Sequence, residues 1–301
     1  MRIGMVGLGK MGMNMSKRLI RGGHEVVAFD MDAARVAEIA GEKGAGAGSL
    51  GELAGKLAHP RFVWLMVPAG KPVDDTVDAL IGTLEKGDTI IDGGNSHYKD
   101  SVRRGAALKE KGINFMDVGV SGGVWGLDEG YCLMAGGDSD TFGRIEPALK
   151  TLAQEDGVLY CGPSGAGHFV KMVHNGIEYG MMAAYAEGFD IMEASPYGVG
   201  LDYEKVAHLW NRGSVIRSWL LELAEDAFKK DPRLSGLTGY VEDSGEGRWT
   251  VQEAVELAVP APVISASLFQ RFRSRSGDSF ADRLLAALRN EFGGHAVKKK
   301  A

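Results

Sequence analysis

Four polar side chains recur at helical spacing in the middle of the chain: Lys171, His174, Asn175 and Glu178. Positions i, i+3, i+4 and i+7 of a helix leave from one stripe, so an amine, an imidazole, an amide and a carboxyl group share one face. The neighbouring apolar positions predict that much of the remaining helix surface is buried; these are Phe169, Val170, Met172, Val173 and Ile177. A polar stripe on a largely buried helix indicates a polar cavity, where such groups could act on a small molecule.

A structural interpretation of the same stripe also exists. Lys171 and Glu178 could form an ion pair, with His174 and Asn175 as solvated neighbours. The apolar surroundings weigh against this alternative, because a buried Lys or Glu is costly unless it is paired or functional. The two interpretations balance on this stretch alone, and the other elements of the chain must decide between them.

A glycine-rich turn follows the first predicted strand. Residues 2–7 form a short apolar run typical of a buried parallel strand, and residues 7–12 read GLGKMG before a helical pattern. A GxGxxG turn at this place in a strand–helix–strand unit is a dinucleotide-binding fingerprint, because its glycines permit a tight turn and let the pyrophosphate approach the helix N-terminus. The predicted cofactor contacts here are Gly7, Leu8, Gly9, Lys10, Met11 and Gly12.

An acidic residue ends the second predicted strand, residues 25–29. Asp30 lies about 20 positions beyond the turn, where a carboxylate can hold the adenosine ribose hydroxyls of NAD and would repel the 2′-phosphate of NADP. No Arg stands at the turn itself, where Met31 and Asp32 follow, although Arg35 is one helical turn on. We therefore predict NAD as the cofactor, with NADP less favoured.

Three later strand ends carry groups suited to ligand contacts, since ligands collect at the carboxyl ends of strands in such sheets. The residues concerned are Val67, Pro68 and Ala69 after the first of these strands, Asn95 after the second, and Ser121, Gly122 and Gly123 after the third. The first group is predicted to contact the cofactor, and the last offers backbone N–H groups to a carboxylate or phosphate. Asn95 could donate to the nicotinamide ribose or the substrate, or could simply open a helix.

The order of the elements predicts the fold class. Strand and helix patterns alternate as far as about residue 162, which predicts an α/β, Rossmann-type doubly wound sheet, mainly parallel, of six or more strands. Only helical periodicity follows, at residues 202–211, 215–228, 250–258, 263–273 and 280–292. We predict a dinucleotide-binding domain over residues 1–163 and an all-helical substrate and dimerisation domain over residues 164–301.

Composition limits the remaining choices. The chain has 301 residues and a formal net charge of −6, which argues against a general nucleic-acid binder. No apolar run approaches the roughly 18 residues of a membrane span, and a strand begins too early to leave room for a signal peptide. Cys132 and Cys161 lie in strand-like runs without metal-ligand spacing, so we expect buried free thiols, no bound metal and a cytoplasmic location.

Two arginines in the helical half are candidates for anion binding. Arg271 lies in the sequence FQRF, and Arg289 opens the sequence RNEFGGH. Arg suits the bidentate recognition of phosphate or carboxylate. An Arg on an exposed helix is more often a solvated side chain, so neither residue supports this interpretation by itself.

Together these motifs make the chain resemble the decarboxylating 6-phosphogluconate dehydrogenases. The matching segments cover nearly the whole chain and read GLGKMG, DGGNSHYKDSVRR, VGVSGGVWG, GAGHFVKMVHNGIEYG, GRWT and RNEFGGH. The segment HFVKMVHNGIEYG is highly specific, whereas SGG is shared by the wider β-hydroxyacid dehydrogenases. The chain looks like the short form of the enzyme, without the second helical repeat of the longer form.

The resemblance implies a role for each matched residue. Lys171 matches the general base of the family, and Glu178 matches its general acid. The residues expected to bind the substrate are Asn95, Ser121, Gly122, Gly123, His174, Asn175, Tyr179, Arg271, Arg289 and His295. Within this set, Tyr179 and Arg271 match positions that hold the substrate phosphate, and the last two match residues that the neighbouring subunit supplies. The resemblance therefore implies a homo-oligomer, a dimer or a tetramer.

Two departures from the family pattern concern the phosphate and the cofactor. Longer members have a Lys four residues before their Lys-Trp-Thr motif, where this chain has Ser244, and the motif itself reads RWT from Arg248. Either Arg248 takes over that phosphate contact, or the contact is missing. The Asn-Arg-Thr turn of NADP-type members is replaced by DMD from Asp30, which supports NAD.

The implied reaction converts 6-phosphogluconate to ribulose 5-phosphate and carbon dioxide with reduction of NAD. Neutral Lys171 would accept the proton of the C3 hydroxyl as a hydride leaves C3, and burial favours the neutral amine. The resulting 3-keto acid has its carboxylate β to a carbonyl and can lose carbon dioxide without a metal. Protonated Lys171 would then stabilise charge on the keto oxygen, and Glu178 would protonate C1 of the product.

Two rival functions are open at this stage. Another β-hydroxyacid dehydrogenase, such as one acting on 3-hydroxyisobutyrate, would share the base and the SGG turn but would need no phosphate site. The residues that argue against that rival are His174, Glu178, Tyr179, Arg289 and His295. A non-catalytic NAD-binding regulator would have no use for Lys171 and Glu178 on one helical face.

Overall fold

Two compact units divide the chain in the computed structural model, which describes residues 1–293 and 296–298. The first unit ends at His174, and the second begins at Asn175. This division falls inside one long helix, later than the predicted domain boundary after residue 163. That boundary stays a prediction.

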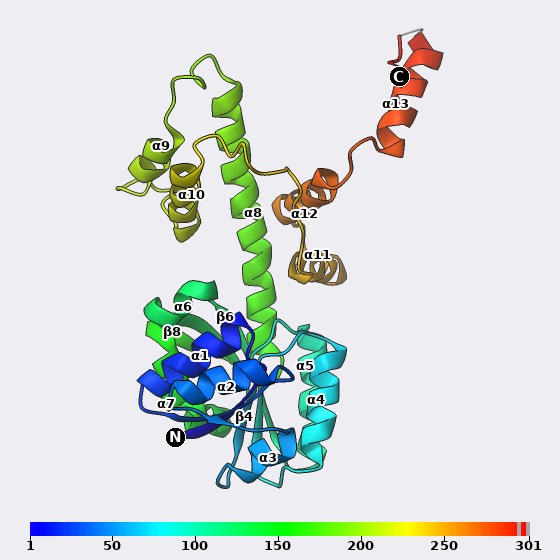
Figure 1. Ribbon diagram of the computed structural model, residues 1–301. Helices are drawn as coiled ribbons and strands as arrows, with labels where there is room; N and C mark the ends of the chain where they lie inside the picture. The colour runs from blue at the N-terminus through cyan, green and yellow to red at the C-terminus, as the bar shows by residue number, and fades with distance from the viewer. Residues whose placement is uncertain (294–295, 299–301) are drawn as a thin grey trace. The chain divides into compact units, whose positions relative to one another are not determined.

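An eight-stranded sheet forms the centre of the first unit (Figure 1). Its strands are β1 (Arg2–Val6), β2 (Glu25–Phe29), β3 (Ala45–Gly46), β4 (Phe62–Leu65), β5 (Thr89–Asp92), β6 (Asn114–Ser121), β7 (Tyr131–Gly137) and β8 (Ala153–Gly162). The order across the sheet is β3-β2-β1-β4-β5-β6-β7-β8, and only the β6–β7 pair is antiparallel. The strand order reverses between β1 and β4, which confirms the predicted doubly wound sheet and puts a ligand crevice at the carboxyl ends of those strands.

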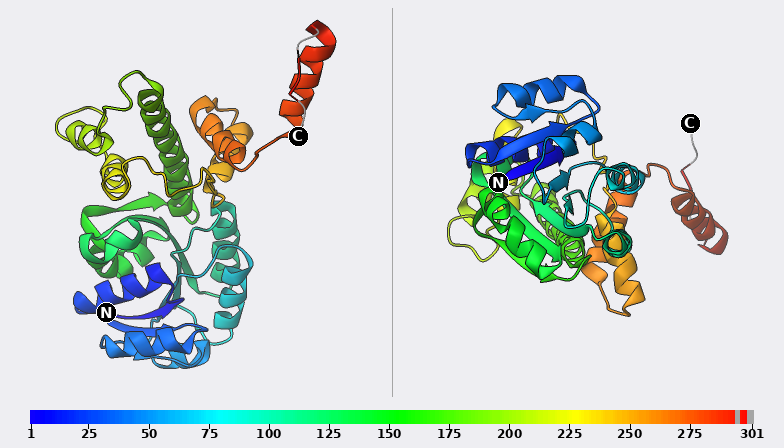
Figure 2. Two further views of the ribbon diagram at one scale, coloured as in Figure 1. Left: turned by 45° about the horizontal axis from the view of Figure 1, so that its top comes forward. Right: turned by 90° about the horizontal axis from the view of Figure 1, so that it is seen from below.

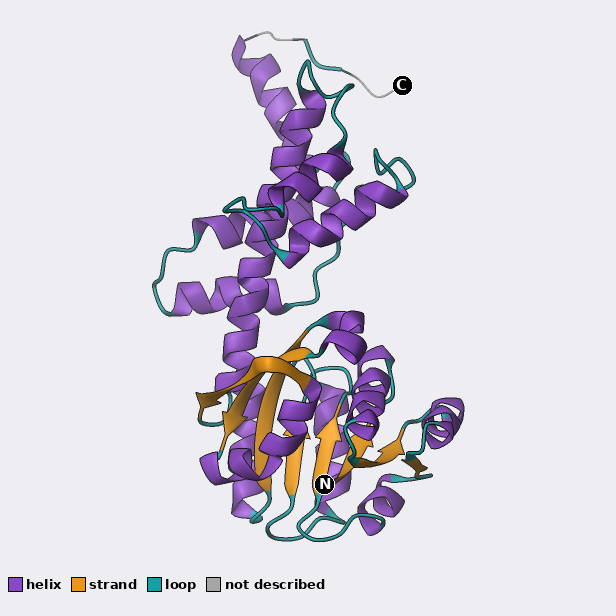
Figure 3. Ribbon diagram, turned by 90° about the vertical axis from the view of Figure 1, so that its left-hand side faces the viewer, coloured by secondary structure: helices purple, strands orange, loops and turns teal. Residues whose placement is uncertain are grey.

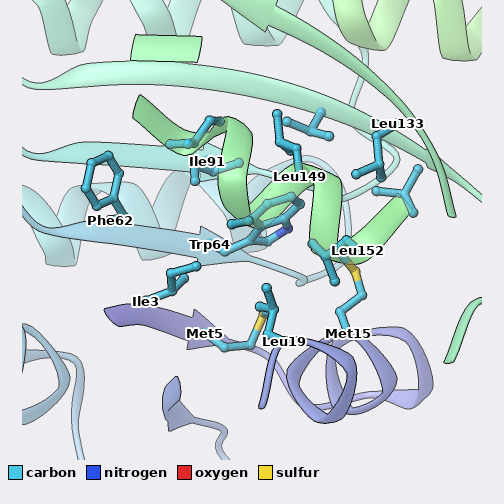
Figure 4. Close-up of a cluster of buried hydrophobic side chains, with 14 of the residues drawn as sticks. Ile3, Met5, Met15, Leu19, Phe62, Trp64, Ile91, Leu133, Leu149 and Leu152 are labelled. Atoms are coloured by element: carbon cyan, nitrogen blue, oxygen red, sulfur yellow. The ribbon is translucent and has the colours of Figure 1, made fainter. Parts of the chain in front are cut away.

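Helices cover both faces of this sheet (Figure 2). They are α1 (Lys10–Arg21), α2 (Ala33–Gly41), α3 (Leu50–Gly55), α4 (Lys71–Ile81), α5 (Tyr98–Glu110), α6 (Gly126–Glu129) and α7 (Ser139–Leu152), with a 3₁₀ turn η1 (Gly123–Trp125). One buried cluster, which includes Trp64 and Leu149, joins α1 and α7 to one face (Figure 4). A second, which includes Val77, joins α3, α4 and α5 to the other. Neighbouring strand residues such as Val26 and Val27 enter different clusters, because successive side chains of a strand point to opposite faces.

Helices also make up the described part of the second unit (Figure 3). They are the later part of α8 (Ala166–Ala194), then α9 (Tyr203–Trp210), α10 (Trp219–Lys230), α11 (Glu246–Glu256), α12 (Pro262–Ser274) and α13 (Phe280–Gly293). No strand follows β8 in the described ranges, in agreement with the predicted all-helical half. The helix predicted from residue 215 begins only at Trp219, because the side chain of Ser218 caps it by accepting a hydrogen bond from the backbone N–H of Leu221.

The expectation that α8 buries its apolar positions is wrong in part. Val170 is 38% exposed and Ile177 is 52% exposed, whereas Lys171 and Asn175 are only 7% and 8% exposed. Val170, Ile177 and Met181 stand at i, i+7 and i+11, so they form a second stripe that the single chain leaves exposed. Two residues of the polar stripe are therefore buried, while His174 and Glu178 are half-buried, which weighs against the solvated ion pair considered above.

The expectation of two buried thiols is also wrong. Cys132 is exposed and Cys161 is half-buried, and both are free. Cys132 stands opposite Ser121 in the last register pair of β6 and β7. In the described part of the chain, no helix is both long and apolar enough to cross a membrane.

Candidate active site

A buried carboxylate fixes the start of α8. Asp117 on β6 is fully buried, and its Oδ1 accepts a hydrogen bond from the backbone N–H of Gly165 at 2.6 Å. Its Oδ2 accepts another from the backbone N–H of His168 at 2.9 Å. The first N–H groups of a helix lack intrahelical partners and carry partial positive charge, so an anion there is stabilising. Asp117 thus sets where α8 leaves the sheet, and with it the place of Lys171.

A glycine on β6 lets α8 lie directly against the sheet. A Cβ on Gly119 would be 2.4 Å from Cβ of Lys171 and 3.1 Å from the carbonyl oxygen of Gly167. Neither atom is the movable end of a side chain, so any larger residue at this position must displace the helix backbone. The close approach brings Lys171 to the carboxyl end of β6, where the turn that begins at Ser121 follows.

Gly119→Ala should lower kcat about tenfold, because a displaced helix moves Lys171 away from the reacting atoms. Overpacking should also reduce the free energy of unfolding by about 1–3 kcal/mol. Steady-state kinetics and thermal denaturation measure the two effects. Gly143→Ala on α7 is the matched control, since a Cβ there meets no atom within 4 Å. A Gly119→Ala enzyme with unchanged kcat would contradict the assigned place of Lys171.

Three polar side chains form a chain at this point. Nζ of Lys171 lies 3.4 Å from Nδ1 of His174, and Nε2 of the same ring lies 3.3 Å from Oγ of Ser121. In a neutral imidazole, one ring nitrogen donates a hydrogen bond and the other accepts one. His174 can therefore connect the amine of Lys171 and the hydroxyl of Ser121 in one hydrogen-bonded chain. The structure thus brings together three of the predicted site residues, from α8 and from the end of β6.

The turn after β6 has the backbone that the SGG sequence predicts. Gly122 has a φ of +136° and Gly123 a φ of +53°, values that favour glycine over other residues. Both residues follow Ser121, and Val120, just before it, lines the cavity described next. Backbone N–H groups of this turn are available to an anionic part of a substrate.

A cavity of about 950 Å³ lies at the carboxyl ends of β1, β2, β4 and β5. Its lining includes all but one of the predicted cofactor contacts: Gly7, Gly9, Lys10, Met11, Gly12, Asp30, Val67, Pro68, Ala69 and Asn95. Leu8 is the exception, because its side chain is buried in the hydrophobic core; its backbone N–H donates to the carboxylate of Asp30. Lining residues that the sequence did not single out include Leu50, Asp75 and Thr76. They stand on α3 and α4, which no ligand motif marks.

The glycine-rich turn has the shape that a pyrophosphate requires. Gly7 has a φ of +92°, and a Cβ on Gly12 would lie 2.0 Å from the carbonyl oxygen of Gly7. Only glycine fits either position, so the backbone at the start of α1 stays uncovered. The shape and volume of the cavity fit a dinucleotide cofactor.

Asp30 is held in place by backbone groups. Its Oδ2 accepts from the N–H of Leu8 at 2.6 Å, and its Oδ1 accepts from the N–H of Asp32 at 2.8 Å. Arg35 also faces the cavity, with Nη1 3.8 Å from Asp30 and Nε 3.4 Å from Oδ2 of Asp32. Within the described lining, the cationic residues are Lys10 and Arg35. Arg35 is therefore already engaged by two carboxylates.

The second unit contains a cluster around Tyr179. The guanidinium carbon of Arg271 lies 3.5 Å from the centre of the Tyr179 ring, and Nη1 of Arg271 donates to the carbonyl oxygen of Glu242 at 2.8 Å. The phenol oxygen of Tyr179 accepts from the backbone N–H of Ser244 at 3.2 Å. These contacts bring together two residues predicted to hold phosphate and the residue that replaces the missing Lys.

Arg248 has a carboxylate partner of its own. Its Nε lies 2.6 Å from Oδ2 of Asp243, and Arg275, which the sequence did not single out, lies 2.7 Å from Oδ1. The Arg248 guanidinium, with Arg275, holds the pKa of the Asp243 carboxyl at about 2. Both arginines also stack against Phe272. Whether Arg248 contacts a substrate phosphate stays a prediction.

The remaining predicted site residues lie further along the chain. Asn175 and Glu178 follow Lys171 on the unbroken helix α8, one and two turns on, so they share its side of the helix. Arg289 is exposed on α13. His295 lies outside the described residues.

Comparison with known sequences covers the chain from end to end. Residues 2–162 match the family described as the NAD binding domain of 6-phosphogluconate dehydrogenase, and residues 167–300 match the family described as its C-terminal domain. The Bacillus subtilis (strain 168) protein YqeC, whose 6-phosphogluconate dehydrogenase name is itself provisional, is 50% identical, and the match covers 100% of both chains. The NAD(+)-dependent, decarboxylating 6-phosphogluconate dehydrogenase of Haloferax volcanii is 45% identical, with 100% of this chain and 99% of that protein covered.

A solved structure agrees with the sequence matches. The 6-phosphogluconate dehydrogenase of Plasmodium falciparum, studied in apo form and in complexes with NADP+ and with 6-phosphogluconate, superposes with a TM-score of 0.84 at 31% identity. The match covers 100% of this chain and 66% of that longer chain.

Proposed function

Because the chain belongs to the 6-phosphogluconate dehydrogenase family, we propose that it catalyses the oxidative decarboxylation of 6-phosphogluconate to ribulose 5-phosphate and carbon dioxide with reduction of NAD. The observation that carries this proposal is the full-length match to a decarboxylating, NAD(+)-dependent relative. The chain of Lys171, His174 and Ser121 supports it, because it supplies a buried base beside the cofactor cavity.

Lys171 acts first as a general base. Its amine accepts the proton of the C3 hydroxyl while the C3 hydrogen leaves with its electron pair, and NAD supplies the acceptor for that hydride. Burial and the neighbouring His174 ring keep water from competing for the amine. Lys171, now an ammonium, holds the oxygen that becomes the C3 carbonyl.

The second half of the reaction is loss of carbon dioxide. The bond from C1 to C2 breaks, and its electron pair moves into the enediol, whose developing oxyanion Lys171 stabilises as an ammonium. Glu178 then delivers a proton to the carbon that becomes C1 of ribulose 5-phosphate. Lys171 and Glu178 can reach neighbouring atoms of one substrate because they leave one side of α8, two turns apart.

The preference for NAD over NADP is proposed to rest on Asp30. Its carboxylate lines the cofactor cavity, with only 11% of the side chain exposed, and two backbone N–H groups hold it there. A carboxylate at this place accepts hydrogen bonds from ribose hydroxyls and repels a 2′-phosphate. Arg35 could attract such a phosphate but is paired with Asp30 and Asp32.

Asp30→Asn should change the ratio of kcat/KM for NAD to that for NADP by about 100-fold in favour of NADP, the equivalent of one or two charged hydrogen bonds. The amide keeps an acceptor for Leu8 N–H but removes the repulsion and releases Arg35. Initial rates with both cofactors test this, and the double variant Asp30→Asn/Arg35→Met should lose the gain with NADP. A wild-type enzyme that favours NADP tenfold would show that Asp30 has been misread.

The exposed stripe of α8 supports a homo-oligomer, a dimer or a tetramer. Val170, Ile177 and Met181 are large apolar residues on one helical stripe, and contiguous exposed apolar surface of this kind usually marks an interaction site. In such an assembly, Arg289 and His295 would complete the site of the neighbouring subunit. No role for a metal ion, nucleic acid or membrane is proposed, and the cytoplasmic location stays a prediction.

One assay tests the reaction as a whole. Purified enzyme with 6-phosphogluconate and NAD should release carbon dioxide and NADH in equal amounts. Release of NADH from 3-hydroxyisobutyrate and not from 6-phosphogluconate would favour the alternative β-hydroxyacid dehydrogenase. NAD binding without turnover of either acid would favour the non-catalytic regulator.

A further inference from the structure

Arg104 is a buried cation to which the reaction described above gives no role. It stands on α5, and its side chain is only 2% exposed. Its guanidinium is engaged on all sides: Nε donates to Oδ1 of Asp74 at 2.8 Å, Nη2 to the carbonyl oxygen of Gly70 at 3.2 Å, and Nη1 lies 3.4 Å from Oδ2 of Asp92. Burying a guanidinium costs free energy, even when partners such as these three offset part of that cost. The presence of a buried cation at this position therefore needs an explanation.

One partner organises the loop that carries Asn95. Asp92 is the last residue of β5 and is fully buried. Its Oδ1 accepts from the backbone N–H of Gly94 at 3.1 Å, and its Oδ2 accepts from the hydroxyl of Ser96 at 2.7 Å. Residues 93–96 therefore wrap around this carboxylate, which leaves Asn95 exposed at the tip of the loop.

The other partner belongs to the neighbouring loop after β4. Gly70 has a φ of +81° and precedes α4, and the loop before it contributes Val67, Pro68 and Ala69 to the cofactor cavity. The two loops touch, since a Cβ on Gly94 would lie 2.9 Å from the carbonyl oxygen of Val67. Arg104 is thus hydrogen-bonded to residues of both loops, on the side of the loops that faces away from the cavity.

The place of these loops along the sheet indicates which half of a dinucleotide they meet. Asp30 at the end of β2 faces the adenosine ribose, and the glycine-rich turn after β1 faces the pyrophosphate. Moving along the sheet from β2 through β1, the next strands are β4 and β5. The loop with Asn95 therefore borders the nicotinamide half and the substrate beside it.

We propose that Arg104 is a positioning residue that sets Asn95 against the nicotinamide ribose and the substrate, through its bonds to Asp92 and to the carbonyl of Gly70. The proposal rests on the cofactor site of the proposed function but not on the identity of the sugar acid. Arg103, the next residue, is 56% exposed and meets Asp74 without reaching Asp92 or Gly70. It is therefore a matched control.

The test compares two ligands by titration calorimetry in Arg104→Lys, Arg104→Met, Asp92→Asn and Arg103→Met. NAD spans both halves of the cavity, whereas ADP lacks both the nicotinamide and the ribose that carries it. In the Arg104 and Asp92 variants the Kd of NAD should rise at least tenfold and that of ADP less than twofold, with Arg104→Lys the mildest. Arg103→Met should match the wild type for both ligands.

Kinetics provide a second readout. The KM for 6-phosphogluconate should rise in the Arg104 and Asp92 variants with a smaller change in kcat, because Asn95 is displaced while Lys171 stays in place. Equal losses for NAD and ADP would show a general structural role and overturn the proposal, as would unchanged binding of both. If Arg104→Met does not fold, Arg104→Lys and Asp92→Asn still decide the matter. An enzyme inactive with 6-phosphogluconate would refute the proposed substrate, while the two binding constants would still test Arg104.

Discussion

Lys171→Met is expected to lower kcat by about 10²- to 10⁴-fold, the usual contribution of a well-placed general base. The residue is 7% exposed and lies on the buried stripe of α8, so no water can readily take over its proton transfer. Methionine has a similar length and no charge, which lets the stem fill the same space against Gly119. The expected loss is therefore chemical and not structural.

Two measurements separate these possibilities. The Kd of NAD should stay within twofold of the wild-type value, because Lys171 is not among the residues that line the cofactor cavity. Lys150→Met is a suitable control, since that lysine is 69% exposed on α7 and pairs with Glu146 on its own helix. Normal turnover by Lys171→Met would remove the residue from the reaction.

The effect of Lys171→Met also bears on His174. The ring of His174 lies between the amine and the hydroxyl of Ser121, so removal of the amine leaves one ring nitrogen without that neighbour. Loss of one hydrogen bond by this half-buried side chain should lower the free energy of unfolding by about 0.5–1.5 kcal/mol. A modest drop in melting temperature is thus compatible with a specific catalytic loss.

Local patterns were enough to predict the parts of the site that lie on single elements. The glycine-rich turn, Asp30 and the polar stripe of α8 are each defined by spacings of fewer than about 20–25 residues, and the strand–helix alternation is read in the same way. The mainly parallel, doubly wound sheet follows from that alternation, because crossover connections in parallel sheets have one hand. The doubly wound fold could therefore be predicted from the sequence.

Contacts between distant segments were not predictable. Asp117 meets the start of α8 about 50 positions later, and nothing in the sequence around it marks a helix cap. Asp92 and Arg104 are the two ends of one motif that the resemblance matched, but the other loop partner, Gly70, lies 34 positions before Arg104 in the chain. The exposure of Cys132 likewise depends on which segments pack against its strand, β7. Such features need the tertiary structure.

Arg271→Met is expected to lower kcat/KM for 6-phosphogluconate about 100-fold, mainly through KM, because one or two charge-assisted hydrogen bonds to the phosphate are lost. The guanidinium lies 3.5 Å from the centre of the Tyr179 ring, which fixes its plane. Nη1 already donates to the carbonyl of Glu242, but a guanidinium has five N–H donors, so it can still face an oxyanion.

The unphosphorylated acid gluconate gives the discriminating measurement. Any rate that the enzyme shows with gluconate should be unaffected by Arg271→Met, since that substrate makes no phosphate contact. Arg273→Met is the control on the same helix, because Arg273 pairs with Asp282 and does not meet Tyr179. Equal losses with both acids would indicate damage to the helical unit.

A small effect of Arg271→Met on 6-phosphogluconate would instead move the phosphate site to the neighbouring cluster. Arg248 and Arg275 share the carboxylate of Asp243, so two cations are balanced by one buried anion and the cluster keeps one net positive charge. In that case Arg248→Met should produce the larger rise in KM. Ser244 has only a hydroxyl and a backbone N–H, and the latter is directed to Tyr179, so it cannot replace the charge of the missing Lys. The phosphate must then be bound by arginines, and comparison of the two variants identifies which of them contributes most.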